Sequence, residues 1–328
     1  MPGAAPPDPA FAVGNDQQYR PAGTVADQRI PIRDDHGRRG LLLGHASRPL
    51  GLPGGGIERL LVVVHGALRD SDRYLANAQA AVGDLGHSTL IVAPQFLADV
   101  DLAGRTSVPY GTLHWEVEGW KGGQPALGPE PISSFAAMDC LLRQLAQPRG
   151  PSGGVAPRVV IFGNSAGGQY VNRYAAVGRA PDALAERGIK VRFIIANPST
   201  YLYFGRERPV AVPGAGRVNR WRYGFDEAPA YVDITARQSL ERYLSRDVTI
   251  VLGSEDRDEA GLLLEVSAAA MAQGANRLER GINYDQHVRK LAHTAGLADR
   301  HRLIRLAGVG HASADVLAAP RTREIMFG

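Results

Sequence analysis

The architecture of this 328-residue chain follows from one run of residues, Arg158-Val159-Val160-Ile161-Phe162-Gly163-Asn164-Ser165-Ala166-Gly167-Gly168. Its first half is apolar and β-branched, which predicts a buried strand, and the residues from Gln169 onward predict a helix. Between the two lies a GxSxG pattern centred on Ser165. A serine in such a turn has a strained backbone angle that exposes its hydroxyl, and the flanking glycines let strand and helix approach closely. Ser165 is therefore the first candidate for a nucleophile.

Apolar segments of strand length recur along the chain and alternate with helix-like stretches. The predicted strands are residues 29–32, 40–43, 59–64, 89–93, 158–162, 191–196, 248–252 and 302–306. The predicted helices are residues 71–82, 132–147, the segment after the serine, and 286–295. Continuous β-branched runs are typical of buried parallel strands. The pattern predicts an α/β protein with a mostly parallel, twisted sheet and helices on both faces.

The N-terminal segment and two internal segments depart from this pattern. Residues 1–28 are rich in proline, glycine and polar side chains, which predicts an arm that is extended on the surface or disordered. The α/β domain is expected to span residues 29–328. Residues 99–131 show no regular period, and residues 197–246 collect aromatic side chains between two predicted strands. We interpret residues 197–246 as an inserted cap or lid.

The aromatic side chains of these irregular segments have two possible roles. They could pack into a small core of their own or line a pocket for a ligand. Trp120 shares this ambiguity. As candidates for substrate contact we take Trp115, Tyr201 and Trp221.

Reactive side chains follow the last two predicted strands. Residues 248–252 run into Gly253-Ser254-Glu255-Asp256-Arg257-Asp258, and residues 302–306 run into Ala307-Gly308-Val309-Gly310-His311. Ligands gather at the carboxyl ends of the strands in such a sheet, so these residues are expected to lie near Ser165. The chain order is serine, acid, histidine.

This arrangement resembles the α/β-hydrolase family over roughly residues 29–320. The resemblance implies that Ser165 is the nucleophile, that His311 is its base, and that Asp256 orients the histidine. Asp258 lies in the same loop and is the second choice for the acid. The other position that the family uses for the acid, after the preceding strand, carries Asn197-Pro198-Ser199 and no carboxylate.

A further feature of the resemblance follows the third predicted strand. His65-Gly66-Ala67 is similar to the family's oxyanion turn, which implies that the backbone N–H groups of Ala67 and Ala166 form the oxyanion hole. We expect His65 to be a structural part of this turn. Only one glycine follows it, so the chain departs from the esterase subfamily with an HGGG turn.

The remaining histidines and the single cysteine are given structural roles. We expect surface roles for His287 and His293, which lie in or beside a predicted helix, and for His301, which begins a strand at the other edge of the sheet. Cys140 lies in a predicted helix, where packing is the favoured interpretation. One cysteine excludes an intramolecular disulfide, and no spacing of histidines and carboxylates indicates a metal site.

Composition limits the partners of the chain. The net charge of +4 comes from arginines scattered among nearly as many acids, which favours a solvated surface over a nucleic-acid interface. Neither a signal-peptide pattern nor an apolar run long enough to span a bilayer is present, so we expect a cytoplasmic protein. No cofactor is expected, and the sequence does not predict an oligomeric state.

The function that the resemblance implies is that of a serine hydrolase acting on a small-molecule ester or acyl substrate. The leading hypothesis is cleavage of a carboxylic ester through an acyl-Ser165 intermediate. The same side chains would serve an amidase, a peptidase or an acyltransferase. A binding protein on a hydrolase scaffold is the alternative from another class, because a fold does not fix a function.

Overall fold

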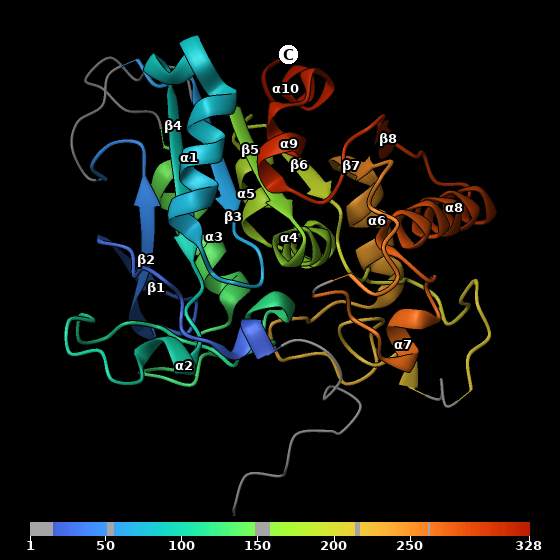
Figure 1. Cartoon of the computed structure of the whole chain (residues 1–328), viewed down its shortest axis with the longest axis horizontal. Helices are drawn as coiled ribbons and strands as arrows, with labels where there is room; N and C mark the ends of the chain where they lie inside the picture. The colour runs from blue at the N-terminus through green and yellow to red at the C-terminus, as the bar shows by residue number, and fades with distance from the viewer. Residues whose placement is uncertain (1–15, 51–55, 148–157, 214–216, 262) are drawn as a thin grey trace, which may run out of the picture.

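The structure is a computed structural model that describes residues 16–50, 56–147, 158–213, 217–261 and 263–328 (Figure 1). The strands of its sheet are β1 (Gln28–Arg33), β2 (Arg39–Ala46), β3 (Arg59–Val64), β4 (Thr89–Gln95), β5 (Arg158–Asn164), β6 (Val191–Ala196), β7 (Asp247–Gly253) and β8 (Arg302–Leu306). The α-helices are α1 (Ser71–Val82), α2 (Asp99–Leu102), α3 (Ser134–Leu145), α4 (Ala166–Val177), α5 (Ala180–Glu186), α6 (Ala236–Ser245), α7 (Ala268–Met271), α8 (Arg277–Ala295), α9 (Ser313–Ala318) and α10 (Pro320–Phe327). Short 3-10 helices are η2 (Asp16–Tyr19), η3 (Gly83–His87) and η4 (Trp120–Gly122).

The eight strands form one sheet in the order β1-β2-β4-β3-β5-β6-β7-β8. β2 pairs antiparallel with β1 and β4, and each pair from β4 through β8 is parallel. The predicted fold class, a mostly parallel α/β sheet, is confirmed, and every predicted strand corresponds to an observed one. The parallel strands all end at one edge of the sheet, so the loops that follow them meet there.

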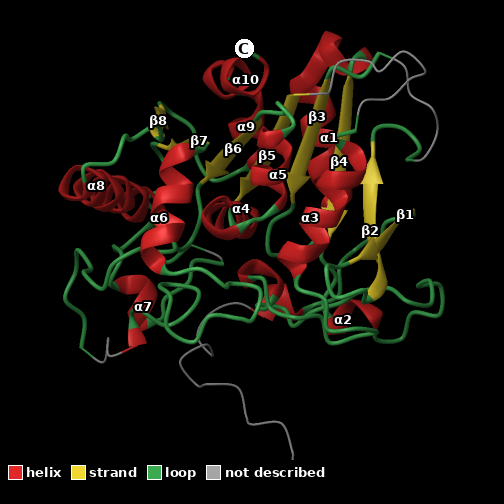
Figure 2. Cartoon of the chain, turned by 180° about the vertical axis from the view of Figure 1, so that it is seen from behind, coloured by secondary structure: helices red, strands yellow, loops and turns green. Residues whose placement is uncertain are grey.

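Helices cover both faces of the sheet. Alternate residues of a strand point to opposite faces. In β3, Leu60, Val62 and Val64 belong to a buried cluster shared with α3, α4, α6 and α8, whereas Leu61 and Val63 belong to a second cluster shared with α1, α9 and α10. Figure 1 shows α1, α9 and α10 on the near side of the sheet, and Figure 2 shows the sheet from the other side. This alternation explains why both faces of the central strands are apolar.

Most of the predicted helices are correct, and one begins earlier than predicted. The predicted helices 71–82 and 132–147 correspond to α1 and α3, and Cys140 is buried in α3 as expected. α8 begins at Arg277, well before residue 286. The side chain of Asn276 accepts a hydrogen bond from the backbone N–H of Glu279, which caps the helix at this earlier start.

The segment interpreted as a lid, residues 197–246, contains a helix of the main fold at its end. α6 packs against α4 and β7, as a crossover helix between β6 and β7 does. The side chains of Thr235 and Gln238 form a capping box at its start. This Thr-x-x-Gln pattern is visible in the sequence and could have predicted the helix. α6 therefore belongs to the α/β fold, and residues 197–235 of the segment interpreted as a lid lie outside its regular elements.

The described part of the N-terminal arm, residues 16–27, is closely attached to the domain. Ala22 and Ala26 are buried, and the backbone N–H of Ala26 donates to Gln95 Oε1 at 2.8 Å. Residues 1–15 of the predicted arm lie outside the described residues. The attachment matters because it lies beside the turn after β3, which belongs to the candidate site.

Candidate active site

Ser165 lies in the tight turn between β5 and α4, with φ 60° and ψ −121°. A positive φ is costly for a residue with a side chain, so the surrounding structure must hold it. The backbone N–H of Ser165 donates to Ala196 O at 3.0 Å, and its carbonyl accepts from Gln169 N at 3.0 Å. The hydroxyl makes no capping hydrogen bond to the helix. The turn therefore fixes the backbone of Ser165 and leaves its hydroxyl unused by α4.

Three glycines make this turn sterically possible. A Cβ atom on Gly163 would lie 2.2 Å from Gly167 O, and one on Gly167 would lie 2.2 Å from Val64 O. A Cβ atom on Gly168 would lie 2.4 Å from Ala196 O. The first turn of α4 is thus pressed between the carboxyl ends of β3 and β6. The glycines of the GxSxG pattern are explained by backbone packing.

Asp256 and His311 lie in contact after β7 and β8. His311 Nδ1 is 2.7 Å from Asp256 Oδ2, the distance of a charge-assisted hydrogen bond. The Asp256 side chain is 3% exposed and also lies 3.6 Å from Arg277 NH1. The buried Asp256 side chain thus lies between a histidine and an arginine. Asp258 is exposed and accepts from Ala260 N instead.

The loop that carries His311 is tied to the residues around Ser165. Asn164 Nδ2 donates to His311 O at 3.0 Å, and Asn197 Nδ2 lies 3.4 Å from Gly310 O. A Cβ atom on Gly253 would lie 2.5 Å from Val309 O, so the loops after β7 and β8 touch. The structure therefore brings together the three segments that carry the predicted serine, acid and histidine. The His311 side chain is 34% exposed and thus open to solvent.

The two predicted oxyanion donors lie on opposite sides of the contact between α4 and the turn after β3. Ala166 is the first residue of α4, so its N–H has no acceptor within the helix. The close packing of Gly167 on Val64 O and His65 O brings this N–H beside the turn that contains Ala67. Ala67 O accepts from Arg69 NH1 at 2.9 Å, which fixes the orientation of that turn.

His65 is fully buried behind the same turn. Its Nδ1 lies 2.8 Å from Gly66 O, and its Nε2 accepts from the backbone N–H of Phe96 at 3.0 Å. These partners require the neutral tautomer with the proton on Nδ1. Burial lowers the pKa of His65 to about 4. The side chain supports the turn structurally, as the sequence predicted.

The three side chains proposed for substrate contact are buried in the protein core. Trp115 Nε1 donates to Ile132 O at 3.2 Å, and Trp221 Nε1 donates to Gly122 O at 2.7 Å. The Tyr201 ring stacks on that of Tyr284, with 4.5 Å between their centroids. The indole and phenol rings pack against other side chains, so we correct the prediction and assign these residues to core packing. Trp120 packs against His65 in the same way, with 4.6 Å between ring centroids.

Two of the three histidines expected at the surface are not there. His301 is 3% exposed, and its ring lies between Asp285 and Asp299, with 2.8 Å from Nε2 to Asp285 Oδ1. His287 is half-buried against the ring of Tyr203, with 4.5 Å between centroids. His293 is exposed as expected. The position of His301 in the sequence does not show the two acids that cover it, and that of His287 does not show the aromatic ring beside it.

Sequence reasoning missed the residues that support the site. Arg277 pairs with Asp256, and Asn164 and Asn197 hold the histidine loop. Arg69 and Asp101 form a fully buried ion pair beside Ala67, with 2.6 Å between Nε and Oδ2. Arg69 follows the His-Gly-Ala turn by two residues, which is the only sequence signal that points to it. The others become visible only when distant loops are brought together.

Two properties of the described residues bear on ligands. No helix among them is both long and apolar enough to cross a bilayer. Within the same described ranges, no three or more histidine, cysteine or acidic side chains are grouped so that they could hold a metal ion.

Comparison with known proteins identifies the fold. No protein-family model and no curated protein matches the chain. A solved structure of poly(aspartic acid) hydrolase-1 from Sphingomonas sp. KT-1 is 21% identical, with a TM-score of 0.65, and the match covers 94% of this chain and 100% of that one. A poly(3-hydroxybutyrate) depolymerase from Bordetella parapertussis is 25% identical, with a TM-score of 0.62, over 90% of this chain and 88% of that one. The chain has the α/β-hydrolase fold.

Proposed function

We propose that the chain is a serine hydrolase that cleaves a carboxylic ester through an acyl-Ser165 intermediate. The observation that carries this proposal is the contact of His311 Nδ1 with the buried Asp256, at the edge of the sheet where Ser165 has φ 60°. A strained serine after β5, a buried carboxylate after β7 and a histidine after β8, all at one edge of the sheet, have the composition of a catalytic triad. The depolymerase that is 25% identical acts, by its name, on a polyester, which supports an ester substrate.

The proposed reaction begins with attack of Ser165 Oγ on the ester carbonyl carbon. His311 Nε2 takes the hydroxyl proton, and the Asp256 carboxylate stabilises the imidazolium that forms. The N–H groups of Ala67 and Ala166 donate to the oxyanion of the tetrahedral intermediate. Collapse of this intermediate breaks the bond to the leaving alkoxide, which receives the proton from His311.

Water completes the cycle. His311 takes a proton from a water molecule, and the resulting hydroxide attacks the acyl carbon of the acyl-serine. The bond to Ser165 Oγ breaks, the carboxylic acid leaves, and Ser165 regains its proton from His311. An amide would require the same groups, so the ester assignment rests on the similarity to the polyester depolymerase.

The test is hydrolysis of short p-nitrophenyl esters by the wild type and by Ser165→Ala. We expect the variant to lose at least about 10³-fold in kcat, because no other hydroxyl occupies the turn. Ser245→Ala is the matched control, since Ser245 is exposed at the end of α6. Equal rates for the wild type and Ser165→Ala would refute the proposal.

A further inference from the structure

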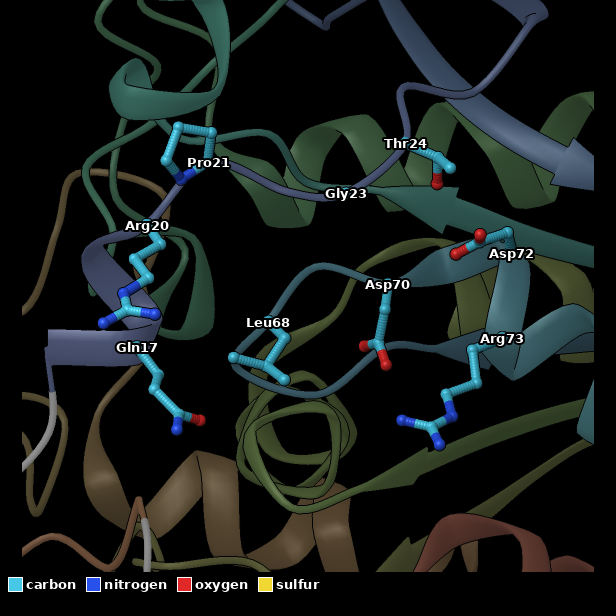
Figure 3. Close-up of a pocket in the computed structure, with 9 residues that line it drawn as sticks. All are labelled: Gln17, Arg20, Pro21, Gly23, Thr24, Leu68, Asp70, Asp72 and Arg73. Carbon is cyan, nitrogen blue, oxygen red and sulfur yellow. The ribbon is translucent and has the colours of Figure 1, made fainter.

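A cavity of about 420 Å³ lies between the N-terminal arm and the turn after β3, and its lining includes four charged side chains. Its volume falls in the range of small-molecule sites. Figure 3 shows Gln17, Arg20 and Pro21 of the arm on one side, Asp70 and Arg73 on the other, and Leu68 between them. The remaining lining residues are Gly23, Thr24 and Asp72. One wall is thus the arm, and the other is the turn with the first turn of α1.

This cavity adjoins the candidate active site. Leu68 is the residue after Ala67, and it is 36% exposed, unusually open for a leucine beside a buried turn. Tyr74, next to Arg73 in α1, places its hydroxyl 3.4 Å from Asn164 O, the carbonyl that precedes Ser165. A Cβ atom on Gly66 would lie 2.9 Å from the same hydroxyl. The wall formed by the turn and α1 therefore packs directly on the residues that flank the proposed nucleophile and oxyanion hole.

A larger cavity, of about 520 Å³, lies at the other edge of the sheet. It is lined by Val191, Asp247 and Arg302, each the first residue of its strand. The proposed chemistry is at the carboxyl ends of the same strands. The larger cavity is therefore separated from Ser165 by the length of the strands, whereas the smaller one adjoins the turn that contains Ala67.

One buried side chain joins the two walls of the smaller cavity. Arg69 is fully buried with φ 57°, a left-handed angle that needs support in a residue with a side chain. Its guanidinium donates to Gln18 O at 2.8 Å and to Arg20 O at 2.6 Å in the arm, and to Ala67 O at 2.9 Å in the turn. It also donates to both carboxylate oxygens of Asp101, at 2.6 and 3.1 Å. All five N–H groups of the guanidinium are thus used.

Asp101 and Gln95 extend this attachment along the arm. Asp101 accepts from Ala22 N at 2.6 Å, in addition to its two bonds from Arg69. The side-chain amide of Gln95 donates to Thr24 O at 2.9 Å and to Arg69 O at 2.8 Å. A buried ion pair with complete hydrogen bonding holds its partners in one geometry. The arm is therefore a fixed wall, and its position is coupled to that of the oxyanion turn.

The lining groups indicate which chemistry the cavity would bind. Arg20 and Arg73 supply guanidinium donors, and Asp70 and Asp72 supply carboxylate acceptors. Asp70 precedes α1 but makes no side-chain capping bond, and burial raises the pKa of its carboxyl. An amide offers one donor and one acceptor, so it can bond to a carboxylate and a guanidinium at once. A plain alkyl chain beside the half-buried Asp70 would offer its carboxyl no hydrogen-bond partner.

We propose that this cavity is a substrate subsite that binds an amide-bearing chain on one side of the ester cleaved at Ser165, with Arg20 and Asp70 as its specificity-determining residues. The inference rests on the proposed function and extends it to a substrate class. Arg69 is a positioning residue that holds the arm and the oxyanion turn together.

The test uses two matched pairs of esters with the full-length protein. For the acyl side, the p-nitrophenyl ester of N-acetyl-β-alanine is compared with p-nitrophenyl hexanoate, which has a chain of equal length without the amide. For the alcohol side, 2-acetamidoethyl acetate is compared with pentyl acetate by acid release at constant pH. The wild type is expected to prefer the amide-bearing ester in at least one pair.

The double variant Arg20→Ala/Asp70→Ala should reduce that preference, measured as the ratio of the two kcat/KM values, at least about tenfold, because a hydrogen bond to a charged group is lost on each side. Arg29→Ala/Asp84→Ala is the matched control, since both side chains are exposed and line no part of the cavity. Hydrolysis of none of the four esters would contradict the proposed function together with the subsite. Hydrolysis without preference for an amide-bearing ester, or with a ratio unchanged in the double variant, would overturn the subsite alone.

Discussion

Gly167→Ala should impair activity through backbone packing alone. The new Cβ atom would start 2.2 Å from Val64 O and 2.7 Å from His65 O, whereas Cβ contacts below 3.0 Å essentially never occur. Both neighbours are backbone atoms at the end of a buried strand, so α4 would have to retreat by about 0.8 Å or more from β3. That movement separates the amide of Ala166 from that of Ala67, the two proposed oxyanion donors.

The expected magnitude follows from two opposing terms. Replacing glycine by alanine in a helix favours folding by about 1 kcal/mol, whereas overpacking of this kind costs roughly 1–3 kcal/mol. The net change in the free energy of unfolding should be a loss of up to about 2 kcal/mol. A displacement near 1 Å in a catalytic constellation reduces turnover by about 10²-fold, so we expect kcat to fall by that order.

The assay combines urea unfolding with ester hydrolysis, and the chain supplies a matched control. Gly310 precedes His311 on the other side of the site, and a Cβ atom there would meet nothing within 4 Å. Gly310→Ala should therefore keep kcat within about threefold of the wild type. If Gly167→Ala retained full activity and gained stability, the tight contact between α4 and β3 would be refuted.

Two further predictions concern the acid and the buried histidine. Asp256→Asn should lower kcat by roughly 10³-fold or more, because an amide cannot stabilise the imidazolium. Asp258→Asn should keep kcat within about twofold of the wild type. Equal mild losses in the initial rates of the two variants would exclude both residues as the proposed triad acid. For His65, the folded pKa of about 4 lies below the unfolded value near 6.5, so the unfolded chain binds more protons and stability is lost as pH falls from about 6.5 toward 4. The free energy of unfolding should fall by about 2 kcal/mol at pH 5 through this group, and His65→Gln should remove that loss. Urea unfolding of both proteins at pH 7.5 and pH 5 measures it. If the free energy of unfolding of His65→Gln depended on pH as that of the wild type does, a neutral buried His65 would be contradicted.

The sheet was predictable because its strands are continuous apolar runs separated by helices. A buried parallel strand must be apolar on both faces, so β3 and β5 are recognisable without any partner. The turn at Ser165 was predictable for a related reason, since close approach of two backbones requires glycine and leaves a pattern in the sequence.

The supporting residues could not be predicted because their partners are distant in the chain. Arg69 meets Asp101 across 32 residues and Gln18 across 51, and no local pattern encodes these contacts. The prediction that the aromatic residues contact the substrate was wrong for another reason. Trp115 and Trp221 each bond a backbone carbonyl through Nε1, and composition does not distinguish a packed indole from one that faces a ligand.

The central claim is that Ser165 is a nucleophile activated by His311. Its most direct test is the mass of the intact folded protein after treatment with a fluorophosphonate, followed by peptide mapping. We predict a single adduct on Ser165 in the wild type and none in Ser165→Ala, with labelling slowed strongly in His311→Ala. A wild type that stays unlabelled, or an adduct that forms on another residue, would contradict the claim.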